Sequence, residues 1–447
     1  STQSSDVSSG ENGVVAYAVP TISGLSGDAA AVGGSTTTGG TNITIDGDNF
    51  GPEHGETVGE LEVTYGPDGT EYRATDCVVT GQQQIACKTQ PGVGKDLKWK
   101  VSIGNQDSGV FESETTRYAN PTVDSITTGP FNTGGNQPIV INGTNFGVAS
   151  DPLTIPAAFF GSGTGTYSDA LVSCTVTIDH VQMSCMTAAG SGKDYQVQVN
   201  ISGQLSAASS GTPFRYSAPV IDVVSVDGAE SVMRTNGTSK ISITGSNFGP
   251  ECTGCVNAAY SSGTNSYTTT CNVVGDTHGE LLCSTVAGVG KDHAWVVTRS
   301  TQSSDVSSGE NGVVAYAAPT LDDTAPLSGA GVESADTTGN QLVVIKGTNF
   351  GPQGHTDILV VYGPPSNRSF YTTGPCTVLG ADAAHFQKIQ CQTVAGVGKD
   401  LKWTVTIGGQ ASDLSKKSSS YVGPVLDQTA PLSGAGVESA DTTGNQL

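Results

Sequence analysis

The stretch Asp46-Gly-Asp-Asn-Phe-Gly51 decides the fold, because the chain repeats its pattern three more times. The other copies are Asn142-Gly-Thr-Asn-Phe-Gly147, Thr244-Gly-Ser-Asn-Phe-Gly249 and Lys346-Gly-Thr-Asn-Phe-Gly351. Their phenylalanines, Phe50, Phe146, Phe248 and Phe350, follow one another at steps of 96, 102 and 102 residues. A period of this length predicts a tandem array of small domains.

Two further phrases keep the same order and nearly the same period. Gly-x-Gly-Lys-Asp recurs around Lys95, Lys193, Lys291 and Lys399, and Tyr-x-x-Pro recurs at Tyr17, Tyr118, Tyr216, Tyr316 and Tyr421. Together the phrases define four complete units, 19–119, 120–217, 218–317 and 318–422, which we call repeats 1 to 4.

The two ends of the sequence continue the same pattern. Residues 1–18 copy 300–317 letter for letter, and residues 429–447 copy 324–342. We therefore interpret 1–18 as the C-terminal strand of a preceding repeat and 423–447 as the start of a further repeat. On this interpretation the sequence is a window on a longer array.

Alternating apolar and polar residues indicate that each repeat consists of strands. Asn42-Ile-Thr-Ile45 and Leu97-Lys-Trp-Lys-Val-Ser-Ile103 alternate with a period of two, and turn residues separate such runs. We find no convincing amphipathic helix. Units of about 100 residues with many short strands predict an all-β fold of tandem immunoglobulin-like sandwiches. The short joints contain proline, which favours an extended rod or filament.

The ten cysteines fit the same frame. Matching places in the four repeats hold Cys77 and Cys87, Cys174 and Cys185, Cys271 and Cys283, and Cys376 and Cys391. We predict one disulfide in each repeat. We also predict a local loop disulfide between Cys252 and Cys255, since neither a redox context nor further zinc ligands accompany them. Disulfides indicate an oxidising compartment, so we expect an extracellular or cell-surface location.

These repeats resemble the IPT/TIG domain, an immunoglobulin-like fold found in plexins, related receptors and many long surface proteins. The resemblance rests on the opening proline, the Gly-Gly-x-x-Ile-x-Ile run at 39–45, the Gly-x-Asn-Phe-Gly turn, the cysteine pair, the Gly-x-Gly turn and the closing tyrosine. It covers nearly the whole chain, four times. It implies the fold but no single function, because the family includes adhesion, receptor, enzyme-accessory and DNA-binding proteins.

Composition and charge exclude two kinds of partner. The net charge is −22, and the chain lacks the basic loops that DNA-binding relatives need, so we expect no nucleic acid. No apolar stretch of about 18 residues is present, so we expect no membrane span in this chain. The acidic residues around the first turn (Asp46, Asp48, Glu53) and after the linker prolines (Asp124, Asp222, Asp322, Asp427) leave calcium open as an alternative to solvated acids.

Three features that suggest chemistry have simpler structural interpretations. The Gly-Val-Gly-Lys-Asp phrase lacks the Ser or Thr that follows lysine in a phosphate-binding loop, so we interpret it as a hairpin turn between the last two strands. Trp99, Trp295 and Trp403 lie on an alternating strand, which favours core or interdomain packing over sugar stacking. The six histidines, among them His54 and His355, are scattered, so we place them on the surface. No catalytic motif recurs, and we predict neither an enzyme nor a cofactor.

Asn-x-Ser/Thr sequons are the strongest chemical signal in the sequence. They stand at Asn42, Asn142, Asn200, Asn236 and Asn367, and we expect several to carry N-glycans in a secreted chain. Asn142 leads into the Asn-Phe-Gly turn, so we expect its glycan to project from a tight loop.

Three functions fit these observations. The first is a structural component of an extracellular glycosylated filament, stalk or surface appendage, with self-association into a fibre or continuation of the same array. The second is an adhesion or recognition receptor ectodomain, which predicts one divergent repeat with unusual loops. The third is an accessory array of a secreted carbohydrate-active enzyme, which predicts a catalytic domain elsewhere in the gene.

Overall fold

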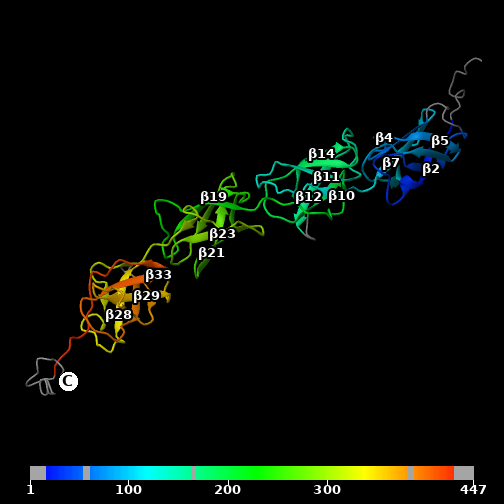
Figure 1. The fold of residues 1–447 in the computed structure, drawn as a ribbon. Helices are drawn as coiled ribbons and strands as arrows, with labels where there is room; N and C mark the ends of the chain where they lie inside the picture. Colours follow the sequence, from blue (N-terminus) through cyan, green and yellow to red (C-terminus); the bar gives the residue numbers. More distant parts are fainter. Residues whose placement is uncertain (1–16, 54–60, 163–166, 381–386, 427–447) are drawn as a thin grey trace, which may run out of the picture. The chain divides into compact units, whose positions relative to one another are not determined.

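The computed structural model describes residues 17–53, 61–162, 167–380 and 387–426 (Figure 1). These residues form an all-β fold in which the 3-10 turn η1 (Asp28–Ala30) is the one helical element. The chain divides into two compact units, one of residues 1–218 with 300–302 and the other of 219–299 with 303–447. Most of the two predicted partial repeats, together with His54 and Asp427, lies outside the described residues.

Repeat 1, coloured blue in Figure 1, consists of two antiparallel sheets with the orders β1-β2-β6-β5 and β4-β3-β7-β8; β9 pairs with β7. The strands are β1 (Thr21–Ser26), β2 (Asn42–Asp48), β3 (Glu62–Gly66), β4 (Tyr72–Arg73), β5 (Thr75–Gly81), β6 (Gln84–Lys88), β7 (Leu97–Ile103), β8 (Gln106–Asp107) and β9 (Phe111–Thr116).

Repeat 2 has the same two sheets, with the orders β10-β11-β15-β14 and β13-β12-β16-β17. The strands are β10 (Thr122–Ile126), β11 (Pro138–Thr144), β12 (Pro156–Ser162), β13 (Asp169–Ala170), β14 (Val172–Ile178), β15 (Gln182–Met186), β16 (Tyr195–Ile201) and β17 (Gln204–Leu205).

Repeat 3 differs, because its strands join into one eight-stranded sheet of order β18-β19-β22-β21-β20-β23-β24 with β25 on β23. Its strands are β18 (Val220–Val226), β19 (Lys240–Ser246), β20 (Cys252–Ser262), β21 (Asn265–Val273), β22 (Glu280–Ser284), β23 (His293–Arg299), β24 (Gln302–Ser303) and β25 (Val313–Val314). The long hairpin β20–β21 makes the connection, since β21 pairs with β22 at one end and β20 pairs with β23.

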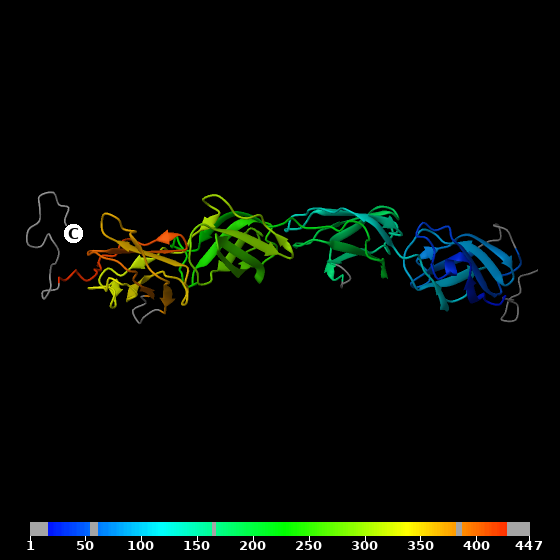
Figure 2. The same ribbon diagram turned by 60° about the horizontal axis from the view of Figure 1, so that its bottom comes forward.

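Repeat 4, yellow to orange in Figures 1 and 2, returns to two sheets with the orders β26-β28-β32-β31 and β30-β29-β33-β34; β27 pairs with β28. Its strands are β26 (Thr320–Leu321), β27 (Leu327–Ser328), β28 (Leu342–Thr348), β29 (Ile358–Gly363), β30 (Tyr371–Thr372), β31 (Thr377–Leu379), β32 (Gln387–Gln392), β33 (Lys402–Ile407) and β34 (Gln410–Ala411).

The inward-facing side chains form four hydrophobic clusters, one centred in each repeat. On β2, for example, Ile43 and Ile45 are fully buried while their neighbours along the strand are partly exposed. This alternation is the pattern that predicted strands. The four cores agree with the predicted number of repeats. The exact residue boundaries of the repeats stay predictions.

A stacked aromatic pair lies at the centre of three cores. Trp99 on β7 faces Tyr65 on β3, with ring centroids 4.3 Å apart and planes 10° from parallel. The same pairs recur as Trp295 with Tyr260 and Trp403 with Tyr362. All three tryptophans are fully buried, which confirms the packing interpretation.

Repeat 2 solves the same packing problem with other residues. Val197 stands where the other repeats have tryptophan, opposite Phe160. Phe214 is fully buried in the same core, with its ring centroid 5.2 Å from that of Phe160. In this core a valine and a phenylalanine therefore occupy the positions that hold tryptophan and threonine in repeat 1.

The repeated Asn-Phe-Gly turn ties each repeat to its own first strand. A Cβ on Gly47 would lie 1.9 Å from the carbonyl oxygen of Thr21, so only glycine fits. Asn49 has φ of 67°, and its side-chain amide donates to the carbonyl of Val19 (3.0 Å). Phe50 enters the core, and Gly51 has φ of 85°. Asn49 and Gly51 therefore adopt backbone conformations with positive φ, which most residues with a side chain rarely adopt.

All ten cysteines form the five predicted disulfides. The pairs are Cys77–Cys87, Cys174–Cys185, Cys252–Cys255, Cys271–Cys283 and Cys376–Cys391. Each of the four pairs that recur links neighbouring segments of one sheet, as Cys77 on β5 and Cys87 on β6 do in repeat 1. They therefore crosslink strands within one sheet, while side-chain packing holds the two sheets of a repeat together.

Candidate functional site

The Gly-Val-Gly-Lys-Asp phrase forms a turn, but not the predicted hairpin. β6 and β7, which flank residues 92–96, belong to different sheets, so the turn carries the chain across the sandwich. The hairpin prediction was wrong because the phrase carries no information on which strands pair. Its aspartate has a positive φ in all four repeats, with 57° at Asp96.

The two glycines of the phrase hold its middle residue in place. A Cβ on Gly92 would lie 2.8 Å from the hydroxyl oxygen of Tyr118, and Gly94 has φ of 106°. The hydroxyl of Tyr72 accepts from the backbone nitrogen of Val93 and donates to its carbonyl, both at 3.1 Å. The valine backbone is therefore fixed at both polar groups.

The same anchor recurs in two other repeats. Tyr267 bonds the backbone of Val289 at 3.2 and 2.9 Å, and Tyr371 bonds the backbone of Val397 at 2.9 Å twice. We call Val93, Val289 and Val397 the knob residues. Burial raises the pKa of Tyr72, so its hydroxyl keeps the proton that this arrangement needs.

In each unit one knob residue enters the next repeat. Val93 is 2% exposed and belongs to the core cluster of repeat 2, and Val289 is 3% exposed and belongs to that of repeat 4. A Cβ on Gly147 would lie 2.3 Å from Val93 Cγ1, and one on Gly351 would lie 2.4 Å from Val289 Cγ1. We call these glycines, with their counterpart Gly51, the socket residues. The last glycine of the Asn-Phe-Gly phrase is thus a contact point between repeats.

A glutamine completes each of these joints. Gln204 Nε2 donates to the carbonyl oxygen of Tyr118 (2.7 Å) in the first unit, and Gln410 Nε2 donates to that of Tyr316 (3.0 Å) in the second. The acceptor is in both cases the tyrosine that closes the preceding repeat. Gln106 donates in the same way to Tyr17 (2.9 Å). Sequence reasoning missed this glutamine, although its recurrence at four matching places was a usable signal.

The joint of the first unit carries further polar contacts. The hydroxyl oxygen of Tyr72 also lies 3.0 Å from Asp151 Oδ2, so its one proton is shared between this carboxylate and the carbonyl of Val93. Thr37 Oγ1 lies 3.0 Å from His180 Nδ1. Leu153 packs against the cores of both repeats. Repeats 1 and 2 therefore share apolar and polar contacts in addition to their covalent link.

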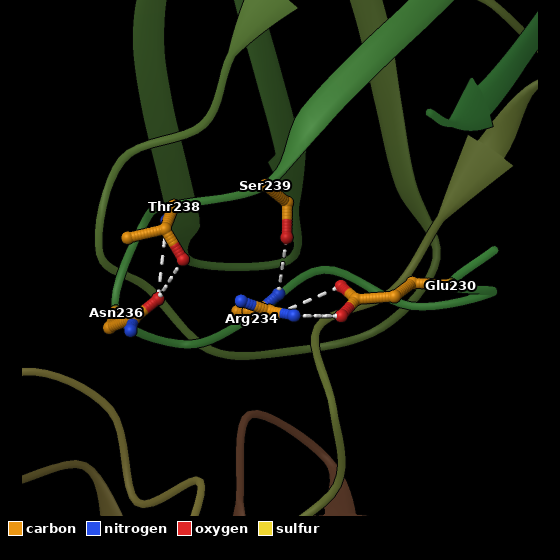
Figure 3. A network of polar contacts seen from close by, with 5 residues as sticks. All are labelled: Glu230, Arg234, Asn236, Thr238 and Ser239. Carbon is orange, nitrogen blue, oxygen red and sulfur yellow. Dashed lines mark hydrogen bonds and ion pairs between the residues drawn. The ribbon is translucent and has the colours of Figure 1, made fainter. Parts of the chain in front are cut away.

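The sequon at Asn236 lies in an exposed turn before β19 (Figure 3). Asn236 Oδ1 accepts from the hydroxyl and the backbone nitrogen of Thr238, at 2.8 and 3.2 Å. The neighbouring Arg234 pairs with Glu230, and its backbone nitrogen donates to Ser239 (2.8 Å). The turn is thus held by local contacts while the asparagine side chain is exposed.

The other sequons differ in accessibility. Asn42 and Asn367 are exposed, whereas Asn142 and Asn200 are half-buried. Asn142 lies within β11, donates to Ser125 Oγ (3.1 Å) and accepts from Gln182 (3.0 Å). The prediction that it projects from a tight loop was wrong, because the strand continues to Thr144 before the turn begins.

Histidine placement needs a correction in repeat 3. His293 is fully buried among the rings of Tyr260, Tyr267 and Tyr316, and its Nε2 lies 3.1 Å from the carbonyl oxygen of Val289. Burial lowers the pKa of His293, a shift that the carbonyl partly opposes. The surface prediction was wrong because His293 begins a core strand, at the place that Leu97 and Leu401 take in repeats 1 and 4.

Among the described residues, no group of three or more His, Cys, Asp or Glu side chains could hold a metal ion. Asp322 instead bonds Thr324 and Ala325 and pairs with Lys346 (3.1 Å). Within the same part of the chain, no helix has the length and apolar character needed to cross a membrane.

Residues 32–118 and 121–216 match the model of the IPT/TIG domain family. These two segments, which cover most of repeats 1 and 2, are tandem IPT/TIG domains. For repeats 1 and 2, this match confirms the resemblance drawn from the recurring phrases.

Solved structures resemble the chain at low identity. The plexin A4 extracellular region (domains 1 to 8) is 13% identical, with 89% of this chain and 48% of that chain covered and a TM-score of 0.22. The Escherichia coli adhesin FdeC is 13% identical over 68% of this chain and 100% of its own (TM-score 0.19). SGBP-B of a xyloglucan utilization locus in Bacteroides uniformis is 16% identical over 61% and 85% (TM-score 0.17). The chain spans about half the length of the plexin structure. No curated protein sequence matches it.

Proposed function

We propose that the chain is a structural component of an extracellular, glycosylated filament, stalk or surface appendage. The observation that carries the proposal is the recurrence of one joint in both units. Val93 with Gly147 and Val289 with Gly351 make the same knob-and-socket contact, and a glutamine bonds the closing tyrosine in each. Repeats that contact their neighbours through one repeated joint are typical of structural arrays.

Disulfides and sequons supply the extracellular part of the proposal. Five disulfides suit an oxidising compartment. N-glycans on the exposed asparagines Asn42, Asn236 and Asn367 would coat the repeats and cover strand edges that otherwise favour aggregation. The proposal needs no cofactor. Bound calcium is the one ligand that the proposal leaves open. A fall in the melting temperature of the intact chain after addition of a chelator would establish that calcium is bound.

Electron microscopy of the native material tests the structural function. Strands of 7 residues, such as β2 and β7, rise about 23 Å, and the turns at both ends of the sandwich bring the predicted axial repeat to about 35–45 Å. Long regular filaments with this spacing, sensitive to removal of N-glycans at their outer layer, are the expected result. Isolated short particles, or particles that end in a distinct globule, would contradict the proposal.

Repeat 3 favours a second candidate, an adhesion or recognition ectodomain. It alone has a continuous eight-stranded sheet, and the Cys252–Cys255 disulfide stands at the start of its long strand β20. A divergent repeat is what a recognition function predicts. Specific binding of the chain to cells or matrix, lost on replacement of residues 252–255 and kept on replacement of the matching loop of repeat 4, would favour this function.

A further inference from the structure

The disulfide Cys252–Cys255 in repeat 3 differs from the other four in its burial. In each recurring pair at least one cysteine is buried, and Cys271 and Cys283 of the same repeat are both 0% exposed. Cys252 and Cys255 are both half-buried, and the two residues between them are exposed. Buried structural cysteines are inert, whereas cysteines near the surface can meet a reaction partner.

The strand pairing of repeat 3 does not depend on this disulfide. Its sequence separation is 3, compared with 10 to 15 for the recurring pairs. A crosslink stabilises a fold less when the loop that it closes is shorter. β20 pairs with β21 at Cys252 and again from Val256, and the register shifts between these two residues. The disulfide therefore closes an irregularity in the strand, and its opening should leave the hydrogen bonds on both sides in place.

The backbone between the two cysteines is held from one side and open on the other. The backbone nitrogen of Gly254 donates to Asn272 Oδ1 on β21 (2.7 Å). Gly254 has φ of 66°, and an ideal Cβ built on it meets no atom of the described residues within 4 Å. An incoming group therefore finds free space beside the disulfide.

A cation lies against one of the two sulfur atoms. Arg299 Nη1 lies 2.8 Å from Cys252 Sγ. Arg299 is the last residue of β23, 47 positions after Cys252, so the sequence around the two cysteines does not reveal this contact. The guanidinium keeps its charge at every pH at which the protein is folded, and a positive charge at this place stabilises a thiolate on Cys252.

We propose that Cys252–Cys255 is a thiol-exchange site, at which an external thiol becomes covalently attached to the chain. A thiolate attacks Cys255 Sγ and forms a mixed disulfide with it. The bond between the two cysteines breaks, and its electron pair stays on Cys252 as a thiolate beside Arg299. A more stable thiolate leaves faster, so the arginine directs the attack to Cys255.

The site needs a thiol as its only co-reactant. A second thiolate can attack the mixed disulfide and release Cys255, which reduces the cysteine pair by two electrons and oxidises the two external thiols to one disulfide. The external thiol is a small molecule or a cysteine of another protein. The proposal does not depend on the structural function proposed above.

Exchange with glutathione on the full chain tests the site. The native chain is incubated with glutathione, the reaction is stopped with acid, free thiols are alkylated, and peptide mass spectrometry locates both labels. We expect glutathione on Cys255 and the alkyl group on Cys252. Cys271–Cys283 is the internal reference, and its exchange should be slower by about tenfold or more, because both of its cysteines are buried.

Substitution of the arginine tests its part in the exchange. Arg299→Gln should slow the reaction of Cys252–Cys255 about tenfold, whereas Arg299→Lys keeps the positive charge and should retain most of the rate. Arg234→Gln is the matched control, because it removes another arginine of repeat 3, one that pairs with Glu230. Circular dichroism shows whether each variant is folded, and the position of glutathione in the unchanged chain tests the proposal without any variant.

A second probe distinguishes the two sources of the thiol. It is a copy of the chain with Cys252→Ser, Cys255→Ser and Ser308→Cys, which carries one thiol at an exposed position. A reducible dimer with the unchanged chain, linked through Cys255, would identify a protein thiol as a co-reactant. Exchange with glutathione and no dimer would identify small thiols.

Three results would overturn the proposal. The first is exchange at Cys252–Cys255 that is no faster than at Cys271–Cys283. The second is glutathione attached to Cys252 in place of Cys255. The third is an equal rate for the chains with Arg299→Gln and Arg234→Gln.

Discussion

The indole nitrogen of Trp99 donates a 2.9 Å hydrogen bond to the hydroxyl of Thr116, inside the core of repeat 1. Trp403 makes the same bond to Ser419 (2.8 Å) in repeat 4. In repeat 3 the matching place holds Val314, and the indole nitrogen of Trp295 is buried with no hydrogen-bond partner among the described residues. One residue position therefore decides whether a buried donor is satisfied.

Thr116→Val should destabilise repeat 1 by about 1–2 kcal/mol, because it leaves the indole nitrogen of Trp99 without an acceptor at nearly constant volume. Calorimetry of the full chain, with hydrogen exchange of β7 to identify the affected repeat, measures the change. Thr122→Val at an exposed strand position is the control. A loss of stability no larger than that of the control would contradict the assignment.

Val314→Thr should have the opposite effect in repeat 3. The new hydroxyl lies where Thr116 and Ser419 lie and can accept from Trp295, so we expect a gain of about 1 kcal/mol and a rise of about 4–8 °C in the melting transition of that repeat. Val314→Ala, which supplies no acceptor, should lower the transition. Equal losses from both substitutions would show that the orphan donor is not limiting.

Acid should weaken repeat 3 through His293. Burial lowers the pKa of this histidine in the folded state. Its contribution to stability is therefore complete above the unfolded pKa of about 6.5 and is lost as the pH falls from there towards the lower folded pKa. Urea unfolding followed by hydrogen exchange of β23, between about pH 8 and about pH 5, should show this loss. The substitution His293→Leu gives this position the leucine that repeats 1 and 4 have, and it should remove the pH dependence of the stability of repeat 3. If the pH dependence persists, other groups cause it.

Alkali should unfold the repeats through their buried tyrosines. Burial raises the pKa of Tyr65 to about 12 and that of Tyr216 to about 12. For a phenol whose folded pKa is raised, the stability is present below the unfolded value of about 10 and is lost as the pH rises through the folded value. Tyrosinate absorbance and circular dichroism should therefore change together between about pH 10 and 12. Complete ionisation in a chain with intact circular dichroism would contradict this prediction.

Gln204→Met should loosen the joint of the first unit. The substitution keeps the side-chain length but leaves the carbonyl of Tyr118 without its 2.7 Å donor, at a cost of about 1–3 kcal/mol. Proteolytic cleavage between residues 118 and 121 should accelerate about tenfold or more. Gln198→Met, which removes a bond to Ser206 inside repeat 2, is the matched control. Equal cleavage of both variants would show that the glutamine does not hold the joint.

The recurring phrases predicted the number of repeats, the strands and the disulfides because the local backbone of the fold requires particular residue types at these positions. Gly47 must lack a side chain wherever Thr21 approaches, so its copies recur with the fold. Exposure was not predictable in this way. Val93 is 2% exposed because it lies in the core cluster of repeat 2, and nothing in its own phrase indicates that contact.

The errors at Asn142 and His293 have the same origin. A sequon shows only that an asparagine has the right neighbours, and the half-buried position of Asn142 depends on Ser125 and Gln182 from other strands. His293 is polar, but the strand that it opens places it among three tyrosine rings. Both outcomes depend on contacts distant in sequence.

The placement of the disulfides sets how far a repeat can lengthen under mechanical tension. Because Cys77 and Cys87 lie on neighbouring strands of one sheet, their bond shields a segment with a sequence separation of only 10, and the largest separation among the four recurring pairs is 15. The remainder of each repeat can still be drawn out at about 3.3–3.6 Å per residue once its sheets shear apart. A pulled array of these repeats would therefore release most of its hidden length one repeat at a time, and would recoil with each short loop still closed.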